Sequence, residues 1–182
     1  LDIRLKRITR LRQDLKIPKL ISANNQNKIV GFFSYFKKKD LFTPKENDRI
    51  VDAIRNSEKR TSGEIRVYIE PKNPLVDPLE RAALIFYKLK MEETDHRNAV
   101  LLYISTTHKE LALFGDHGIH EKVGTEYWQK QVQDMLQHFK NNNLADGIVN
   151  CIMHIGETLC EKFPYIATED KNELPDEIIF GK

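Results

Sequence analysis

The stretch NAVLLYISTTHKELALFGD, residues 98–116, decides the fold that this sequence predicts. It contains two apolar runs of strand length, separated by the short polar turn TTHK. The unbroken apolar run over residues 99–104 is typical of a central strand that is covered on both faces. Because a short turn joins only antiparallel neighbours, we expect the two strands to pair antiparallel.

Helices and one further strand surround this pair. Thr43-Pro44-Lys45-Glu46 predicts a helix start, with a threonine cap, proline in the first helical position and glutamate three residues after the cap. The alternating run GEIRVYIE, residues 63–70, predicts a strand. We expect a helix of about four turns over 77–94. Two more helices are predicted near 120–141 and 144–163.

The order of these elements predicts an α/β sandwich with a small mixed sheet. A helix joins the first strand to the second, so these two should be parallel with a right-handed crossover. We expect this domain over residues 41–165. A basic extension, predicted to be disordered and with a linker at 22–28, precedes it over 1–40. A polar tail over 166–182 is either loose or adds an edge strand.

Charge is distributed unevenly along the chain. It has 182 residues, 40% hydrophobic and 31% charged, which suits one domain with a buried core. Residues 1–42 carry a net charge of +8 and the remaining residues −6. Because binding to nucleic acid phosphates needs clustered Lys and Arg, we expect no nucleic-acid partner for the acidic domain.

Two observations bear on the compartment and on membranes. Cys151 and Cys160 would lie about 13 Å apart along one helix, too far for a disulfide, which favours a reducing, cytoplasmic location. No apolar run reaches the roughly 20 residues of a membrane span. The basic amphipathic pattern near the N-terminus and the aromatic run 31–42 suit peripheral membrane contact, and the alternative is an unstructured chain end.

Polar side chains gather at two opposite edges of the predicted sheet. The starts of the first two strands and the end of the third define what we call the first edge. It collects Ser62, Glu64, Arg97, Asp116, His117, His120 and Glu121. The second edge, at the other end of the strands, collects Glu70, Asp77 and Thr107. Ligands of open α/β sheets usually bind at the carboxyl ends of parallel strands, which favours the second edge.

Each candidate at the first edge has a functional and a structural interpretation. Asp116, Glu64 and Glu121 could supply carboxylate oxygens to a divalent cation, but Asp116 could also simply cap the following helix. His117 and His120 are either ligands for a transition metal or solvated side chains. Arg97 could pair with Glu64 or hold a phosphate group by its guanidinium fork.

Four blocks of the chain resemble the TPM domain family. They are TSGEIRVYIE, RNAVLLYIS, ELALFGDHGIHEKVGTEYW and FKNNNLADGIVNCIMHIGETLCEKFP, all within 41–165, and they are most similar to the stand-alone bacterial branch. The resemblance implies a Rossmann-like three-layer α/β/α sandwich. It also implies binding of divalent metal, calcium included, and acid phosphatase activity of the kind attributed to plant members. The shared blocks fall on the first edge, which favours Asp116.

The sequence contains none of the common phosphatase nucleophile motifs. It has no Cys-x5-Arg loop, no Asp-x-Asp-x-Thr/Val and no Arg-His-Gly. Hydrolysis of a phosphoester would therefore need a bound cation to activate water. We expect a cytoplasmic protein that binds Ca²⁺ or Mg²⁺, with a phosphorylated small molecule or a protein as its partner and weak metal-dependent phosphatase activity as the enzymatic hypothesis. The alternative is a non-enzymatic protein- or membrane-surface interaction module.

Overall fold

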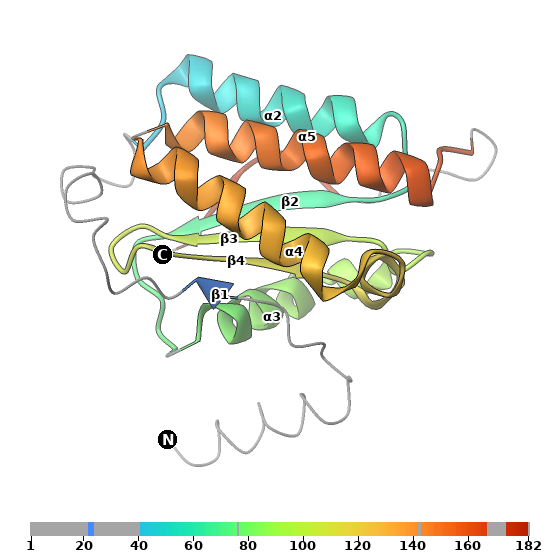
Figure 1. Cartoon of the computed structure of the whole chain (residues 1–182), viewed down its shortest axis with the longest axis horizontal. Helices are drawn as coiled ribbons and strands as arrows, with labels where there is room; N and C mark the ends of the chain where they lie inside the picture. The colour runs from blue at the N-terminus through green and yellow to red at the C-terminus, as the bar shows by residue number, and fades with distance from the viewer. Residues whose placement is uncertain (1–21, 24–40, 76, 142, 167–173, 182) are drawn as a thin grey trace, which may run out of the picture.

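The computed structural model describes residues 22–23, 41–75, 77–141, 143–166 and 174–181 (Figure 1). Within these ranges the strands are β1 Ser22–Ala23, β2 Ile65–Glu70, β3 Val100–Ser105, β4 Glu110–Gly115 and β5 Ile179–Phe180. The helices are α2 Pro44–Glu58, α3 Pro78–Lys88, the 3-10 helix η2 Met91–Glu93, α4 His117–Lys140 and α5 Leu144–Lys162.

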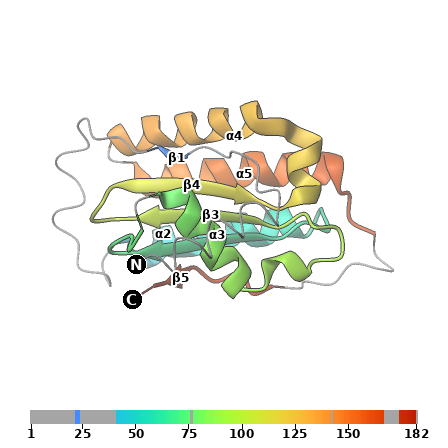
Figure 2. The ribbon, with the colours of Figure 1, turned by 90° about the horizontal axis from the view of Figure 1, so that it is seen from below.

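The described strands form one mixed sheet between two helical layers. Their order is β1-β4-β3-β2-β5. Helices α2, α4 and α5 lie on one side of the sheet and α3 lies on the other (Figure 1). Seen from below, α3 stands in front of the sheet and α2 and α5 lie behind it (Figure 2). The predicted three-layer α/β/α sandwich with a mixed sheet is therefore confirmed.

Strand pairing follows the connection lengths. β2 pairs parallel with β3, with Ile65 opposite Val100. β3 pairs antiparallel with β4, with Val100 opposite Gly115. Both pairings confirm the predictions made from the helical crossover and the short turn.

The predicted capping box begins α2. The Thr43 hydroxyl accepts a hydrogen bond from the Glu46 backbone N–H at 3.3 Å. In return the Glu46 carboxylate accepts from the Thr43 backbone N–H at 2.8 Å. These bonds satisfy backbone donors that have no partner inside the helix, so the helix begins where the sequence predicts.

Two helices differ from the prediction at residues whose backbone φ is positive. α3 ends at Lys88, and Lys90 has a φ of 58°, which a right-handed helix excludes, so η2 follows as a separate turn. α4 begins at His117 and is broken at Gly124, with φ 71° and ψ 177°, a conformation that is open essentially to glycine alone.

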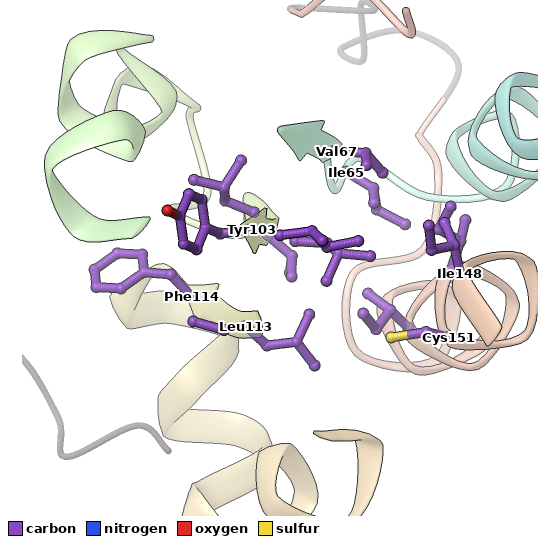
Figure 3. Packing of buried hydrophobic residues seen from close by; sticks show 14 of the residues in the cluster. Ile65, Val67, Tyr103, Leu113, Phe114, Ile148 and Cys151 are labelled. Carbon is purple, nitrogen blue, oxygen red and sulfur yellow. The ribbon is translucent and has the colours of Figure 1, made fainter. Parts of the chain in front are cut away.

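The core lies on both faces of the sheet. Ile65 and Val67 of β2 point toward α5, where Ile148 and Cys151 meet them, while Tyr103 and Phe114 lie on the face toward α3 (Figure 3). Val100, Leu101, Leu102 and Tyr103 are all at most 1% exposed, which confirms β3 as a strand covered on both faces. Burial raises the pKa of the Cys151 thiol to about 12, so this thiol is unreactive at neutral pH.

The two chain ends contribute short edge strands. Ser22 and Ala23 pair with β4, so these two residues of the expected linker form a strand. The rest of 1–40, including the predicted disorder and the membrane-contact segments, lies outside the described residues. At the other end, β5 pairs with β2, so the C-terminal tail adds an edge strand, which was one of the two predicted alternatives. Both cysteines are free, as predicted. Among the helices described here, none has the length and apolar character needed to cross a membrane.

Candidate functional site

The first edge is assembled as the topology predicts. The backbone N–H of Val100 donates to the carbonyl of Glu64 at 2.8 Å, and that of Asp116 donates to the carbonyl of Ala99 at 2.9 Å. These bonds place the start of β2, the start of β3 and the end of β4 side by side. The residues that follow β4 therefore begin α4 at this edge.

Asp116 and Arg97 form a two-pronged ion pair at the centre of the first edge. Arg97 Nε donates to Asp116 Oδ2 at 2.6 Å, and Arg97 Nη2 donates to Asp116 Oδ1 at 2.9 Å. The Asp116 side chain is 3% exposed, but the Arg97 side chain is 46% exposed. The carboxylate is thus built into the fold, while the guanidinium can reach water.

Asp116 also caps α4, so the structural and functional interpretations of this residue coexist. Its Oδ1 accepts a hydrogen bond from the His117 backbone N–H at 2.7 Å. The capping prediction is confirmed. The helix N-terminus places partial positive charge beside the carboxylate, and this attraction stabilises the start of α4.

The first turn of α4 lies directly on the backbone before β3. The carbonyl of Arg97 accepts from the Gly118 backbone N–H at 2.9 Å. A Cβ added to Gly118 would stand 2.3 Å from the carbonyl oxygen of His96. Arg97 itself has a φ of 51°, which is uncommon for a residue other than glycine. This close approach holds Arg97 opposite Asp116.

The two histidines of the first edge have separate partners. His117 Nε2 lies 3.0 Å from Glu121 Oε1, and both side chains are mostly exposed. His120 Nδ1 accepts a hydrogen bond from Trp128 Nε1 at 3.1 Å. Burial lowers the pKa of His120, and the charge of His117 lowers it further. The Nδ1 atom of His120 is therefore occupied by its bond to the buried Trp128.

Glu64 lies within a different charged group. It is 3% exposed, and its negative charge raises the pKa of both Glu58 and Arg66. The charges that act on Arg97 come from Asp116, Tyr87 and Glu92. The expected pairing of Arg97 with Glu64 is therefore replaced by its pairing with Asp116.

Two further residues complete the surroundings of the ion pair. Asn98 is fully buried, and its Nδ2 donates to Ser62 Oγ at 3.2 Å. Tyr87 of α3 is close enough that the charge of Asp116 adds to burial in raising the pKa of its hydroxyl. Sequence reasoning missed Tyr87, because within the helical pattern of 77–94 it resembles an ordinary core position.

The second edge is occupied by structural bonds. Glu70 is 2% exposed, and its oxygens accept from Arg81 Nε at 2.8 Å and Arg81 Nη2 at 2.7 Å. Tyr103 donates to Glu70 Oε1 at 2.7 Å. Asp77 caps α3 through the Leu79 N–H at 2.8 Å. The Thr107 N–H donates to a backbone carbonyl at 2.7 Å.

A ready-made cluster of metal ligands is not seen in the described part of the chain. Within those residues, no group of three or more His, Cys, Asp or Glu side chains is placed to hold a metal ion. Of the three predicted ligands, Asp116 pairs with Arg97 and Glu121 pairs with His117, whereas Glu64 lies near Glu58 and Arg66. A cation at the first edge would require at least one of these pairings to open.

Comparison with known proteins places this geometry in a family. The sequence matches the TPM domain over residues 35–158. The chain belongs to the TPM domain family. No curated protein matches the sequence. Among solved structures, the chain is similar to the NMR structure of the BA42 protein from the psychrophilic bacterium Bizionia argentinensis, with 38% identity and a TM-score of 0.72. That match covers 80% of this chain and 99% of BA42, and its extent confirms the resemblance seen in the sequence blocks.

Proposed function

We propose that this TPM-domain protein binds a divalent cation at the first edge, with Asp116 as the anchoring ligand. The observation that carries the proposal is a buried carboxylate whose counter-ion is a partly exposed arginine. Ca²⁺ and Mg²⁺ prefer carboxylate oxygens. Because the Arg97 side chain is already partly exposed to water, it can move away from Asp116 and remain solvated.

The proposal makes Arg97 a competitor of the cation. Both oxygens of Asp116 accept from Arg97, and Oδ1 also accepts from the His117 N–H. A metal ion must therefore take the place of the guanidinium. Ca²⁺ takes about 6–8 oxygen ligands, so water and backbone carbonyls complete the set, with Glu121 as a further candidate. Glu64 stays a sequence-based prediction that this proposal does not need.

An NMR titration with CaCl₂ and with MgCl₂ tests the competition. Asp116→Asn keeps the size of the side chain and removes its charge, so the binding shifts near residue 116 should disappear. Arg97→Gln removes the competing cation, so it should bind Ca²⁺ about tenfold more tightly than the unchanged chain, a difference of about 1.4 kcal/mol. As a matched control, His117→Ala should matter little for Ca²⁺ and more for Zn²⁺, because imidazole prefers the softer ion.

Two outcomes would refute this placement of the site. If Arg97→Gln binds Ca²⁺ more weakly, the guanidinium supports the site instead of competing for it. If Asp116→Asn leaves the titration unchanged while Asp77→Asn abolishes it, the cation binds at the second edge.

Assays on the same residues can distinguish a hydrolase from a non-enzymatic binding module. A phosphorylated ligand could accept the two-pronged donor set of Arg97 once a cation holds Asp116. Phosphatase assays with and without chelator, with Asp116→Asn as the control for contaminating enzyme, decide between the two functions. Cation binding without turnover would favour the non-enzymatic interaction module, consistent with the lack of phosphatase nucleophile motifs in the sequence.

A further inference from the structure

A second group of charged residues lies where the end of α2, the start of β2 and the C-terminal segment 174–181 meet. Glu58 ends α2, Glu64 and Arg66 belong to the β2 region, and Asp176 comes from the C-terminal segment. Glu64 and Arg66 are 3% and 7% exposed. β5, which ends this segment, is bonded to the edge of β2.

Hydrogen bonding within this group requires a proton. Glu58 Oε1 accepts from the Ile65 backbone N–H at 2.8 Å. Glu58 Oε2 is buried and accepts no hydrogen bond from a donor in the described residues. The side chain of Asp176 lies within hydrogen-bond reach of Glu58, and Arg55 Nε donates to Asp176 at 2.9 Å. Ionised carboxylates only accept, so Glu58 and Asp176 can bond only if one of them is protonated.

The surrounding charges favour that proton. Burial and the negative charge of Glu64 raise the pKa of Glu58 to about 9, with a smaller contribution from Asp176. Arg66 lies near Glu58, Glu64, Asp176 and Glu177, whose negative charges raise its pKa, while burial lowers it. Arg55 Nε donates to Asp176 Oδ2 at 2.9 Å, whereas the pKa of Glu58 is raised, so we assign the proton to Glu58.

We propose that a proton shared between the carboxyl groups of Glu58 and Asp176 fastens the C-terminal segment 174–181 to the domain, and that losing this proton releases the segment. With Glu58 neutral, its O–H donates to Asp176 and joins α2 to the segment. With Glu58 ionised, three buried or partly buried carboxylates face Arg55 and Arg66 at the same place. We expect the segment, and not α2 or β2, to move away, because its pairing with the sheet in the described residues is limited to the two-residue strand β5.

The sign of the pH dependence follows from the direction of the shift. The folded protein holds the Glu58 proton up to about pH 9, whereas the ordinary value for glutamate is 4.5. Between these values the folded state binds more protons than the unfolded state. The contribution to stability is therefore complete below 4.5 and is lost progressively as the pH rises toward 9.

The experiment follows the carboxyl and the segment together. The ¹³C carboxyl signal of Glu58 and the methyl signals of Ile178, which is 9% exposed, are recorded against pH. We expect both to change with one midpoint near pH 9, while the methyl signals of Ile104 in β3 stay unchanged. Unchanged Ile104 signals show that the segment is released without global unfolding.

Glu58→Gln supplies the matched variant. Glutamine is neutral at every pH, accepts from the Ile65 N–H and donates to Asp176 through its amide. The Ile178 transition should vanish in this variant. Its free energy of unfolding relative to the unchanged chain should grow as the pH rises from about 5 to about 9. Glu177→Gln, which neutralises an exposed carboxylate on the same segment, should keep the transition.

Three results would overturn the inference. They are a Glu58 carboxyl that titrates near 4.5, an Ile178 signal that does not respond when Glu58 ionises, and a Glu58→Gln variant that keeps the transition.

Discussion

At the scale of single residues, His120 links protonation to the packing of Trp128. Trp128 is fully buried and is the single tryptophan of the chain. Its Nε1–H donates to Nδ1 of His120, which can accept only while the imidazole is neutral. The pKa of His120 is lowered by burial first and by His117 second, against a smaller opposite effect of Glu121. We therefore expect His120 to titrate below 6.5 and Trp128 fluorescence to change with the same midpoint.

The pH dependence of stability that His120 contributes has the opposite sign to the one that Glu58 contributes. The folded pKa of His120 is lower than the unfolded one, so the stability it contributes is present above 6.5 and falls as the pH drops toward the folded value. His117→Ala removes the neighbouring charge and should move the His120 midpoint upward. A midpoint at or above 6.5 in the unchanged chain would contradict this account.

At the scale of elements, the start of α2 rests on a few local bonds. Thr43→Ala removes the hydroxyl that accepts from the Glu46 N–H at 3.3 Å and donates to Glu46 Oε2 at 2.7 Å. We expect it to lower the free energy of unfolding by about 1 kcal/mol, as for other capping residues. Urea denaturation measures this change.

Thr43→Ser keeps the hydroxyl and is the matched control, so it should stay close to the unchanged chain. Equal losses in the two variants would mean that the threonine methyl group, and not the capping hydroxyl, stabilises the start of α2.

At the scale of the whole molecule, two similar Arg–carboxylate pairs stand at opposite ends of the sheet. Arg81 and Glu70 have side chains 24% and 1% exposed, and Tyr103 adds a third bond. Arg97 in the other pair is 46% exposed. Arg81→Leu leaves Glu70 buried without its counter-ion and should cost about 3 kcal/mol or more. Arg97→Gln should cost less, because glutamine can still donate to Asp116 and the carboxylate keeps its bond from the His117 N–H.

Urea denaturation without added metal compares the two variants. The double variant Glu70→Gln with Arg81→Leu should recover part of the loss, since no unpaired buried charge remains. Equal losses in the free energy of unfolding for Arg81→Leu and Arg97→Gln would show that both ion pairs serve mainly to stabilise the fold. That result would also weaken the proposal that a cation can displace Arg97.

The sequence alone determined the elements and the edge where they meet. The cap at Thr43, the uninterrupted apolar β3 and the short turn before β4 depend on neighbouring residues and on connection lengths. Such patterns specify which strands are parallel and where α2 begins. For the same reason, the convergence of Arg97, Asp116 and the start of β2 followed from topology without any knowledge of side-chain positions.

Only the tertiary structure decided which charges pair. Arg97 pairs with Asp116 because the positive φ of Arg97 and the close contact of its backbone with Gly118 place it at the start of α4. Arg55 and Asp176 are 121 residues apart, and no sequence period connects them. Their meeting with Glu58 depends on how the C-terminal segment lies along β2. Contacts of that kind arise from packing between distant segments, because local propensity decides whether a segment forms a strand but not which distant segment packs against it.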